Sequence, residues 1–208
     1  MGMSCFTEGL ARYLTPEQLD CLREAQIGIA GAGGLGSNCA VMLARCGVGR
    51  FVIADHDSVE PSNLNRQQYL PGDVGRPKVE ALAAVLRAIN PDVAVVTQRV
   101  RLDAEVTPSI FNDCAIVVEA VDDAETKRMI VASLLGEGTF VVAASGMGGW
   151  GGAPMGSRRL GDSMVIVGDF TNEVGPGLPP LAPRVVMAAA MQADAVLQRL
   201  LGPCTGLR

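Results

Sequence analysis

The chain has 208 residues, enough for one substantial core and too few for two comfortable domains. Apolar residues make up 49% and charged residues 19%, so the composition excludes a disordered protein. The formal net charge of -5 offers no basic surface, so we expect no nucleic-acid partner. No apolar run approaches the ~20 residues that span a bilayer, and the N-terminus lacks a signal-peptide pattern, so we expect a cytoplasmic protein with no membrane partner.

Helix and strand patterns alternate as far as residue 145. A capping-box pattern at 15–18, with proline at the first helical position, predicts a helix from Pro16. Apolar runs of buried-strand length predict strands at 26–30, 50–54, 93–97, 115–120 and 139–145. Helical patterns separate these runs, at 37–46, 78–90, 104–111 and 123–135. The alternation predicts an α/β fold: a Rossmann-like, doubly wound, mostly parallel sheet with right-handed crossovers.

The pattern changes after residue 145. Six of the eleven residues in 146–156 are glycine, and two short β-like pieces follow, around Arg158 and at 164–167. We expect both pieces to be antiparallel additions at the sheet edge, followed by an extended proline-rich linker and a C-terminal helix over 185–201. The predicted organisation is one domain over 1–208. It comprises an N-terminal helical arm (1–25), a nucleotide-binding core (26–145) and a C-terminal part with the glycine-rich loop, edge strands and helix (146–208).

A glycine-rich turn, GAGGLG at 31–36, lies between an expected strand and an expected helix, as the dinucleotide fingerprint requires. Glycines let phosphate oxygens approach the backbone amides at the positive end of the helix. Four of them are therefore expected to bind a nucleotide: Gly31, Gly33, Gly34 and Gly36. Asp55 lies 24 residues beyond Gly31, where an acid can bind ribose hydroxyls. This motif fits an NAD(P)-dependent oxidoreductase as well as several other nucleotide-binding classes.

Further polar side chains gather just outside the carboxyl ends of the strands, in the crevice where open α/β sheets bind ligands. The candidates are Asp55, Asp57, Asn63, Arg66, Gln67 and Lys78. A hydride-transfer site has no evident use for Arg66 and Lys78 beside the phosphates. A reaction that spreads negative charge over a phosphorus centre needs such cations.

Two acids and one histidine complete the polar residues of this edge. Asp122 follows the strand expected at 115–120, so it faces the same crevice and is assigned a catalytic role as the Mg²⁺ ligand. Its neighbour Asp123 can cap the next helix. His56, the only histidine, is expected to point away from the crevice because successive strand residues alternate faces.

The six cysteines contain no C-x-x-C pair, so we expect no zinc site and no disulfide. Cys39 and Cys46 are interpreted as small core residues. Trp150, the only tryptophan, lies in the glycine patch, where it is either a pocket wall or a loop anchor.

Together these motifs resemble the ThiF/MoeB/HesA superfamily, the bacterial relatives of ubiquitin-activating enzymes. The resemblance runs from about Ile27 to Ser145. It includes G-x-G-G-L-G-S (31–37), D-x-D (55–57), S-N-L-N-R-Q (62–67), G-x-P-K-V-E (75–80), I-N-P (89–91) and the strand-end Asp122. The short length, A-S-G-M-G at 144–148 and L-P-P-L-A-P-R-V at 178–185 are most similar to the short ThiF subgroup, the adenylyltransferases for a sulfur-carrier protein such as ThiS.

The resemblance implies ATP-dependent adenylylation of the C-terminal glycine of a small β-grasp sulfur carrier ending in Gly-Gly, in thiamine biosynthesis or on a MoeB-like molybdopterin route. It also implies a homodimer. By the same resemblance Asp55 binds the ATP ribose and Asp122 binds Mg²⁺. Three residues contact the phosphates with the support of Gln67: Asn63, Arg66 and Lys78. The glycine patch at 146–152 is expected to flank a channel for the carrier tail.

The chain departs from the family pattern at several positions. Larger members carry two C-x-x-C pairs for zinc, and this chain has none. No cysteine lies between Cys114 and Cys204, so we expect the chemistry to stop at the acyl-adenylate. Of the family's R-Y-x-R-Q pattern, which supplies an arginine to a partner subunit, only Arg12 and Tyr13 remain. Lys127 stands where the family usually has arginine, and Asp123 where it usually has asparagine.

Overall fold

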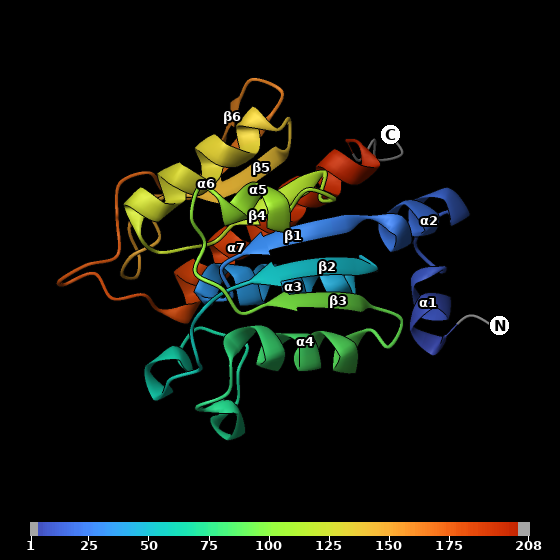
Figure 1. The fold of residues 1–208 in the computed structure, drawn as a ribbon, viewed down its shortest axis with the longest axis horizontal. Helices are drawn as coiled ribbons and strands as arrows, with labels where there is room; N and C mark the ends of the chain where they lie inside the picture. The colour runs from blue at the N-terminus through green and yellow to red at the C-terminus, as the bar shows by residue number, and fades with distance from the viewer. Residues whose placement is uncertain (1–3, 204–208) are drawn as a thin grey trace.

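The computed structural model describes residues 4–203, and they form one seven-stranded sheet covered by helices (Figure 1). The sheet order is β3-β2-β1-β4-β5-β7-β6. The strands are β1 (Gln26–Ala30), β2 (Arg50–Ala54), β3 (Ala94–Gln98), β4 (Ile116–Glu119), β5 (Phe140–Ala144), β6 (Gly156–Leu160) and β7 (Met164–Gly168). Every neighbouring pair is parallel except β6 and β7. The predicted mostly parallel sheet is confirmed. One detail was wrong, because β7 runs parallel to β5 and only β6 is antiparallel.

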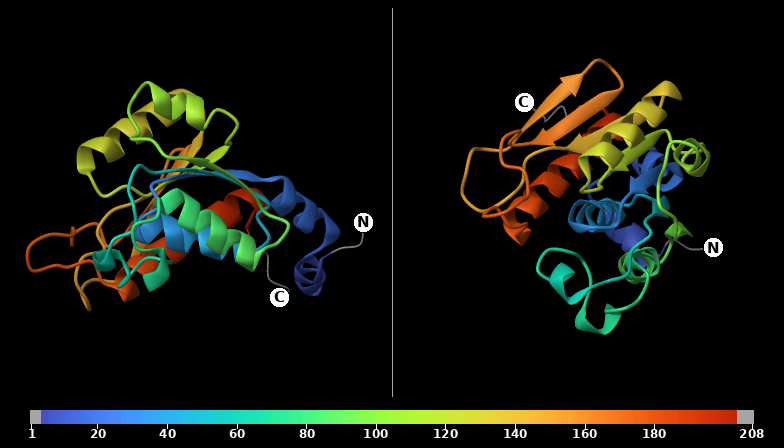
Figure 2. Two further views of the ribbon diagram at one scale, coloured as in Figure 1. Left: turned by 60° about the horizontal axis from the view of Figure 1, so that its bottom comes forward. Right: turned by 60° about the vertical axis from the view of Figure 1, so that its left-hand side comes forward.

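Helices cover both faces of the sheet (Figure 2). They are α1 (Cys5–Leu10), α2 (Pro16–Glu24), α3 (Gly34–Arg45), α4 (Lys78–Ile89), α5 (Val106–Ile110), α6 (Ala124–Gly136) and α7 (Ala182–Leu201), with short 3₁₀ turns at Pro61–Asn63 and Pro71–Asp73. Buried residues of α3, α4 and α7 form one core cluster with one face of the sheet, and α6 packs on the other face. None of the helices within residues 4–203 is long and apolar enough to cross a bilayer.

Side chains alternate faces along β1, which explains why the sheet has a core cluster on each face. Ile27 and Ile29 point into the larger cluster, whereas Ala30 belongs to the smaller one. Gly28 makes room for a neighbour on that second face, because a β-carbon there would lie 2.7 Å from the ring of Phe111. The strand is therefore buried on both sides, which is why its sequence reads as a continuous apolar run.

Helix boundaries differ from the predictions where glycine or proline lies inside a helix. The helix expected at 37–46 begins three residues earlier, at Gly34, and the C-terminal helix begins at Ala182 rather than 185. Glycine has low helix propensity, but at the start of α3 its small size permits close packing. The expected capping box of α2 is present: Thr15 accepts from the amide of Gln18.

The described cysteines, Cys5, Cys21, Cys39, Cys46 and Cys114, all have free thiols. Cys39 is completely buried in the core, as predicted, and Cys46 is only partly covered. The remaining cysteine, Cys204, lies outside the described residues, as do residues 1–3 and 205–208.

The glycine turn brings α3 against the end of β1. A β-carbon on Gly36 would lie only 1.8 Å from the carbonyl oxygen of Gly31. Gly31 itself has φ +100° and packs on the backbone of Ala120 at the end of β4. The first turn of α3 can therefore lie against the end of β1, and the glycine turn against the end of β4, only while these positions lack side chains.

Replacing Gly36 by alanine is expected to lower the free energy of unfolding by about 3 kcal/mol, because the added methyl overlaps backbone that cannot move aside. Urea denaturation measures this loss. The matched control is Gly136→Ala in α6, where an added β-carbon meets nothing within 4 Å and stability should stay level or rise slightly. Equal unfolding midpoints for the two variants would contradict the packing argument.

Candidate functional site

A cavity of about 520 Å³ lies at the carboxyl ends of β1, β2 and β4. The chain leaves β1 toward β2 and β3 on one side, and β4 lies on the other side, so the cavity is at the switch point where doubly wound sheets bind ligands. Ten predicted site residues line it: Gly31, Gly33, Gly34, Asp55, Asp57, Asn63, Arg66, Gln67, Lys78 and Asp122. The eleventh, Gly36, lies outside the lining, and its missing side chain serves the packing of α3.

Asp55 ties the end of β2 to the glycine turn. One carboxylate oxygen accepts the amide of Ala32 at 2.6 Å, and the other accepts the amide of Asp57 at 2.8 Å. Gly33 is the N-cap of α3 and supplies no capping side chain. The first amides of the helix therefore face the cavity without a side-chain acceptor, which is the arrangement that binds phosphate.

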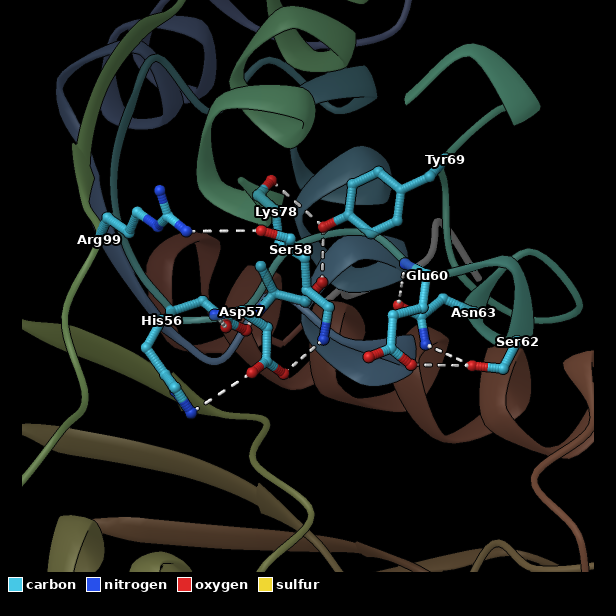
Figure 3. Close-up of polar contacts among 11 residues, drawn as sticks. His56, Asp57, Ser58, Glu60, Ser62, Asn63, Tyr69, Lys78 and Arg99 are labelled. Atoms are coloured by element: carbon cyan, nitrogen blue, oxygen red, sulfur yellow. Dashed lines mark hydrogen bonds and ion pairs between the residues drawn. The ribbon is translucent and has the colours of Figure 1, made fainter. Parts of the chain in front are cut away.

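Lys78 and Asp57 form an ion pair in the cavity wall (Figure 3), with 2.7 Å between Nζ and Oδ2. The lysine side chain is only 8% exposed. Burial acts to raise the pKa of Asp57, but the hydrogen bond and charge of Lys78, with His56 and Arg101, hold it below its usual value. We predicted these residues as separate ligands, and the pair between them was not predicted.

His56 also lines the cavity, so the prediction that it points away was wrong. Its Nε2 lies 3.3 Å from Oδ1 of Asp57 (Figure 3). The prediction assumed that side chains alternate faces up to His56. However, β2 ends at Ala54, and residues beyond a strand need not alternate faces.

Arg66 is held by the loop that follows β2. Its Nη1 donates to the carbonyl oxygen of Ser62 at 3.0 Å and to Oδ1 of Asn65 at 2.8 Å. Burial lowers the pKa of its guanidinium, and the charge of nearby Asp122 opposes this shift. Asn38 fixes the loop by donating both to the carbonyl of Gly34 and to that of Arg66. Asn38 was not among the predicted site residues.

Three more polar residues of this loop are buried. Asn63 accepts the amide of Glu60 at 3.0 Å and so caps its own turn. Tyr69, another missed residue, donates to the carbonyl of Ala32 at 2.6 Å (Figure 3). A tyrosine just after the S-N-L-N-R-Q motif was a possible signal, because a buried phenol needs a partner. The Oε1 atom of Gln67 is buried without a hydrogen-bond partner within the described chain, so Gln67 still has hydrogen-bonding capacity at the cavity.

The two acids after β4 have different surroundings, and the expected cap by Asp123 is present. Asp123 caps α6 by accepting the amide of Thr126 at 2.7 Å. The carboxylate of Asp122 lines the cavity and has no hydrogen bond or ion pair with any residue in 4–203. Asp55, His56 and Asp57 also offer ligand atoms within 4.8 Å of one another, but both of those carboxylates already serve described partners. Asp122 thus fits a hard cation such as Mg²⁺ better than that group does.

A second buried ion pair supports the wall on the β4 side. The carboxylate of Glu119 is completely buried and accepts from Nζ of Lys127, which lines the cavity, and from the amide of Val121. Burial raises the pKa of Glu119, and the charge and hydrogen bond of Lys127 act against that rise. This pair was not predicted, because its members lie eight residues apart on different elements, β4 and α6.

The glycine patch contributes less to the cavity than expected. Only Met147 of residues 146–156 lines it, and Trp150 lies outside the lining with 71% of its surface exposed. Arg184 at the start of α7 holds the patch by donating to the carbonyls of Gly151 and Ala153 and to the buried carboxylate of Asp169. From the part of the chain after β5, Met147 lines the cavity together with Glu173, Val174 and Pro180.

Residues 8–206 match the ThiF family. The chain belongs to the ThiF family. It is 35% identical over 191 residues to the sulfur carrier protein ThiS adenylyltransferase of Bacillus subtilis, covering 87% of this chain and 56% of that protein. It is 35% identical over 190 residues to the adenylyltransferase and sulfurtransferase UBA4 of Candida glabrata, covering 89% of this chain and 40% of that protein. This ThiF-family chain thus spans about half the length of these relatives or less.

Among solved structures, the chain is similar to E. coli tRNA N6-threonylcarbamoyladenosine dehydratase, TcdA, in complex with ATP. The TM-score is 0.85, with 22% sequence identity and 97% coverage of each chain. At this identity the match establishes that the ThiF-family chain shares the fold of that protein.

Removing the partner of Glu119 is expected to make stability depend on pH. In Lys127→Met the buried carboxyl group should have a folded-state pKa further above its unfolded value of about 4.3. A raised folded pKa favours folding at low pH, and this contribution is lost as the pH rises. We expect the variant to lose about 3 kcal/mol of unfolding free energy at pH 8 and much less at pH 5.

Urea denaturation at the two pH values measures this difference, with Lys127→Arg as the control that keeps the charge. A Lys127→Met variant that is equally destabilised at pH 5 and pH 8 would show that Glu119 does not carry the effect.

Proposed function

We propose that this chain is an ATP-dependent adenylyltransferase that activates the C-terminal glycine carboxylate of a small sulfur-carrier protein as an acyl-adenylate, with release of pyrophosphate. One observation carries the proposal: the uncapped start of α3 and the side chains of Arg66, Lys78 and Asp122 line the same cavity. Two relatives that match most of this chain are named adenylyltransferases, which supports the reaction class.

Each residue then has a distinct role in nucleotide binding. Asp55 already fixes the glycine turn and retains lone pairs for the ribose hydroxyls. The amides at the start of α3 receive the phosphates, with Arg66 beside them. Lys78 acts as part of a pair with Asp57, so it contributes directed N–H donors more than net charge. Asn63 and Gln67 complete the phosphate side of the cavity.

The reaction needs little proton transfer. A terminal carboxyl group has a pKa near 3.5, so it is ionised at neutral pH and needs no general base. Its oxygen forms a bond to the α-phosphorus as the bond to the bridging oxygen breaks, and that electron pair leaves with pyrophosphate. The chain therefore acts by aligning the carboxylate and by placing Arg66 and the helix amides against the negative charge. Mg²⁺ held by Asp122 would neutralise further phosphate charge.

The proposed chemistry stops at the acyl-adenylate. No cysteine is among the residues that line the cavity, so the described chain places no thiol where it could attack the activated carboxylate. Sulfur would then be delivered by another protein. More specifically, we propose that the carrier is ThiS-like and ends in Gly-Gly, and that the reaction belongs to thiamine biosynthesis. We also propose that the protein is a cytoplasmic homodimer that contains no zinc.

ATP–pyrophosphate exchange tests the reaction directly. Exchange should appear only when a Gly-Gly carrier is added, and Arg66→Ala should lower kcat/KM about 100-fold because a charge-stabilising donor is lost. Arg128→Ala is the matched control, since Arg128 is an exposed arginine on α6 outside the cavity lining. Exchange without any carrier, or full exchange in Arg66→Ala, would contradict the proposal. A MoeB-like role would appear as selective exchange with a molybdopterin-synthase carrier.

The metal assignment has its own test. Asp122→Asn keeps the size of the side chain and removes its charge, so half-maximal exchange should require about tenfold more Mg²⁺ with little change in the protein's melting temperature. The control is Asp123→Asn, which retains an N-cap for α6. An unchanged Mg²⁺ requirement in Asp122→Asn would rule Asp122 out as the ligand.

A further inference from the structure

The charges that line the cavity do not favour an anionic ligand. The acidic lining residues are Asp55, Asp57, Glu60, Asp122, Asp123 and Glu173. The basic ones are Arg66, Lys78, Arg101 and Lys127. A triphosphate entering a cavity with more carboxylates than cations is repelled unless the cations nearest to it are free to act.

Two of the four cations are already neutralised by direct partners. Lys78 is paired with Asp57, and Lys127 is paired with the buried Glu119. Arg66 donates only to neutral oxygens, and Arg101 has no hydrogen bond or ion pair with any described residue. Arg66 and Arg101 are thus the cations of the cavity lining whose charge remains available to a ligand. Arg66 belongs to a recognised motif, whereas the role of Arg101 is unassigned.

Arg101 is exposed and lines the cavity. It follows β3, between Val100 and the buried Leu102, and all three residues line the cavity. Its charge lowers the pKa of Asp57, which follows β2, and that of Asp123, which follows β4. Asp57 and Asp123 also line the cavity, so Arg101 shares it with acids that follow the strands on either side of β1.

We propose that Arg101 is a second phosphate-binding arginine, which contacts the phosphates of a bound nucleotide in this cavity. The inference rests on the nucleotide site of the proposed function. The exposed side chain is free to reorient, and its planar guanidinium can donate two hydrogen bonds to one phosphate. The neighbouring apolar lining residues Val100 and Leu102 are suited to the adenine base, so the base and the phosphates would contact different residues.

Nucleotide binding by Arg101→Gln tests this assignment. Isothermal titration with MgATP should show a dissociation constant about tenfold higher than that of the unchanged protein, because a charge-assisted contact is lost. Binding of adenosine, which has no phosphate, should be unchanged. The dependence of ATP affinity on salt should also become shallower, since one cation no longer participates.

Arg99→Gln is the matched control. Arg99 lies two residues away in the same segment, does not line the cavity, and donates to the hydroxyl of Ser58 at 3.5 Å (Figure 3). We expect this variant to bind ATP like the unchanged protein. Equal ATP affinity for Arg101→Gln and the unchanged protein would overturn the assignment, and so would a parallel loss of adenosine binding.

These outcomes are distinct from those of the proposed reaction. If ATP binds and Arg101→Gln weakens it but no carrier supports exchange, the reaction class fails and the role of Arg101 stands. If ATP binds equally to both proteins while exchange is normal, the role of Arg101 fails alone. An unchanged protein that does not bind MgATP contradicts both.

Discussion

The close packing of the glycine turn and α3 on the ends of β1 and β4 is the constraint on which the site depends. Gly36 lies against the carbonyl of Gly31, and Asp55 holds the amide of Ala32, so the turn between strand and helix is fixed from both sides. The start of a 12-residue helix then faces the crevice with no capping side chain. The anion binding that we propose at this edge would be a consequence of backbone placement, with the cationic side chains arranged around it.

Ion pairing then decides which of those charges act on a ligand. Lys78 and Lys127 are charged and close to the cavity, yet Asp57 and Glu119 neutralise them and hold them in place. Such pairs give the wall a defined shape more than a net field. In the nucleotide complex that we propose, the phosphate charge would therefore be met by the helix amides, Arg66, Arg101 and a cation at Asp122. This division explains how a cavity rich in carboxylates can serve an anionic substrate.

The sequence predicted features that local patterns determine. Apolar runs located β1 and β2 to the residue, the capping box located α2, and the glycine turn with its strand-end acids located the cavity. Features that depend on contacts between distant residues were missed. The Glu119–Lys127 and Arg184–Asp169 pairs, the Asn38 brace and the direction of β7 arise only when the elements pack. Arg101 escaped notice because no motif contains it, and its position matters only once β3 lies beside β2.

The structure of this chain with Mg²⁺ and a non-hydrolysable ATP analogue is the most direct measurement of the central claim. We expect the ribose to contact Asp55, the phosphates to lie against the first turn of α3, and the guanidinium of Arg66 to contact the phosphates. A nucleotide whose phosphates lie away from α3, with Arg66 still directed at Ser62 and Asn65, would contradict it.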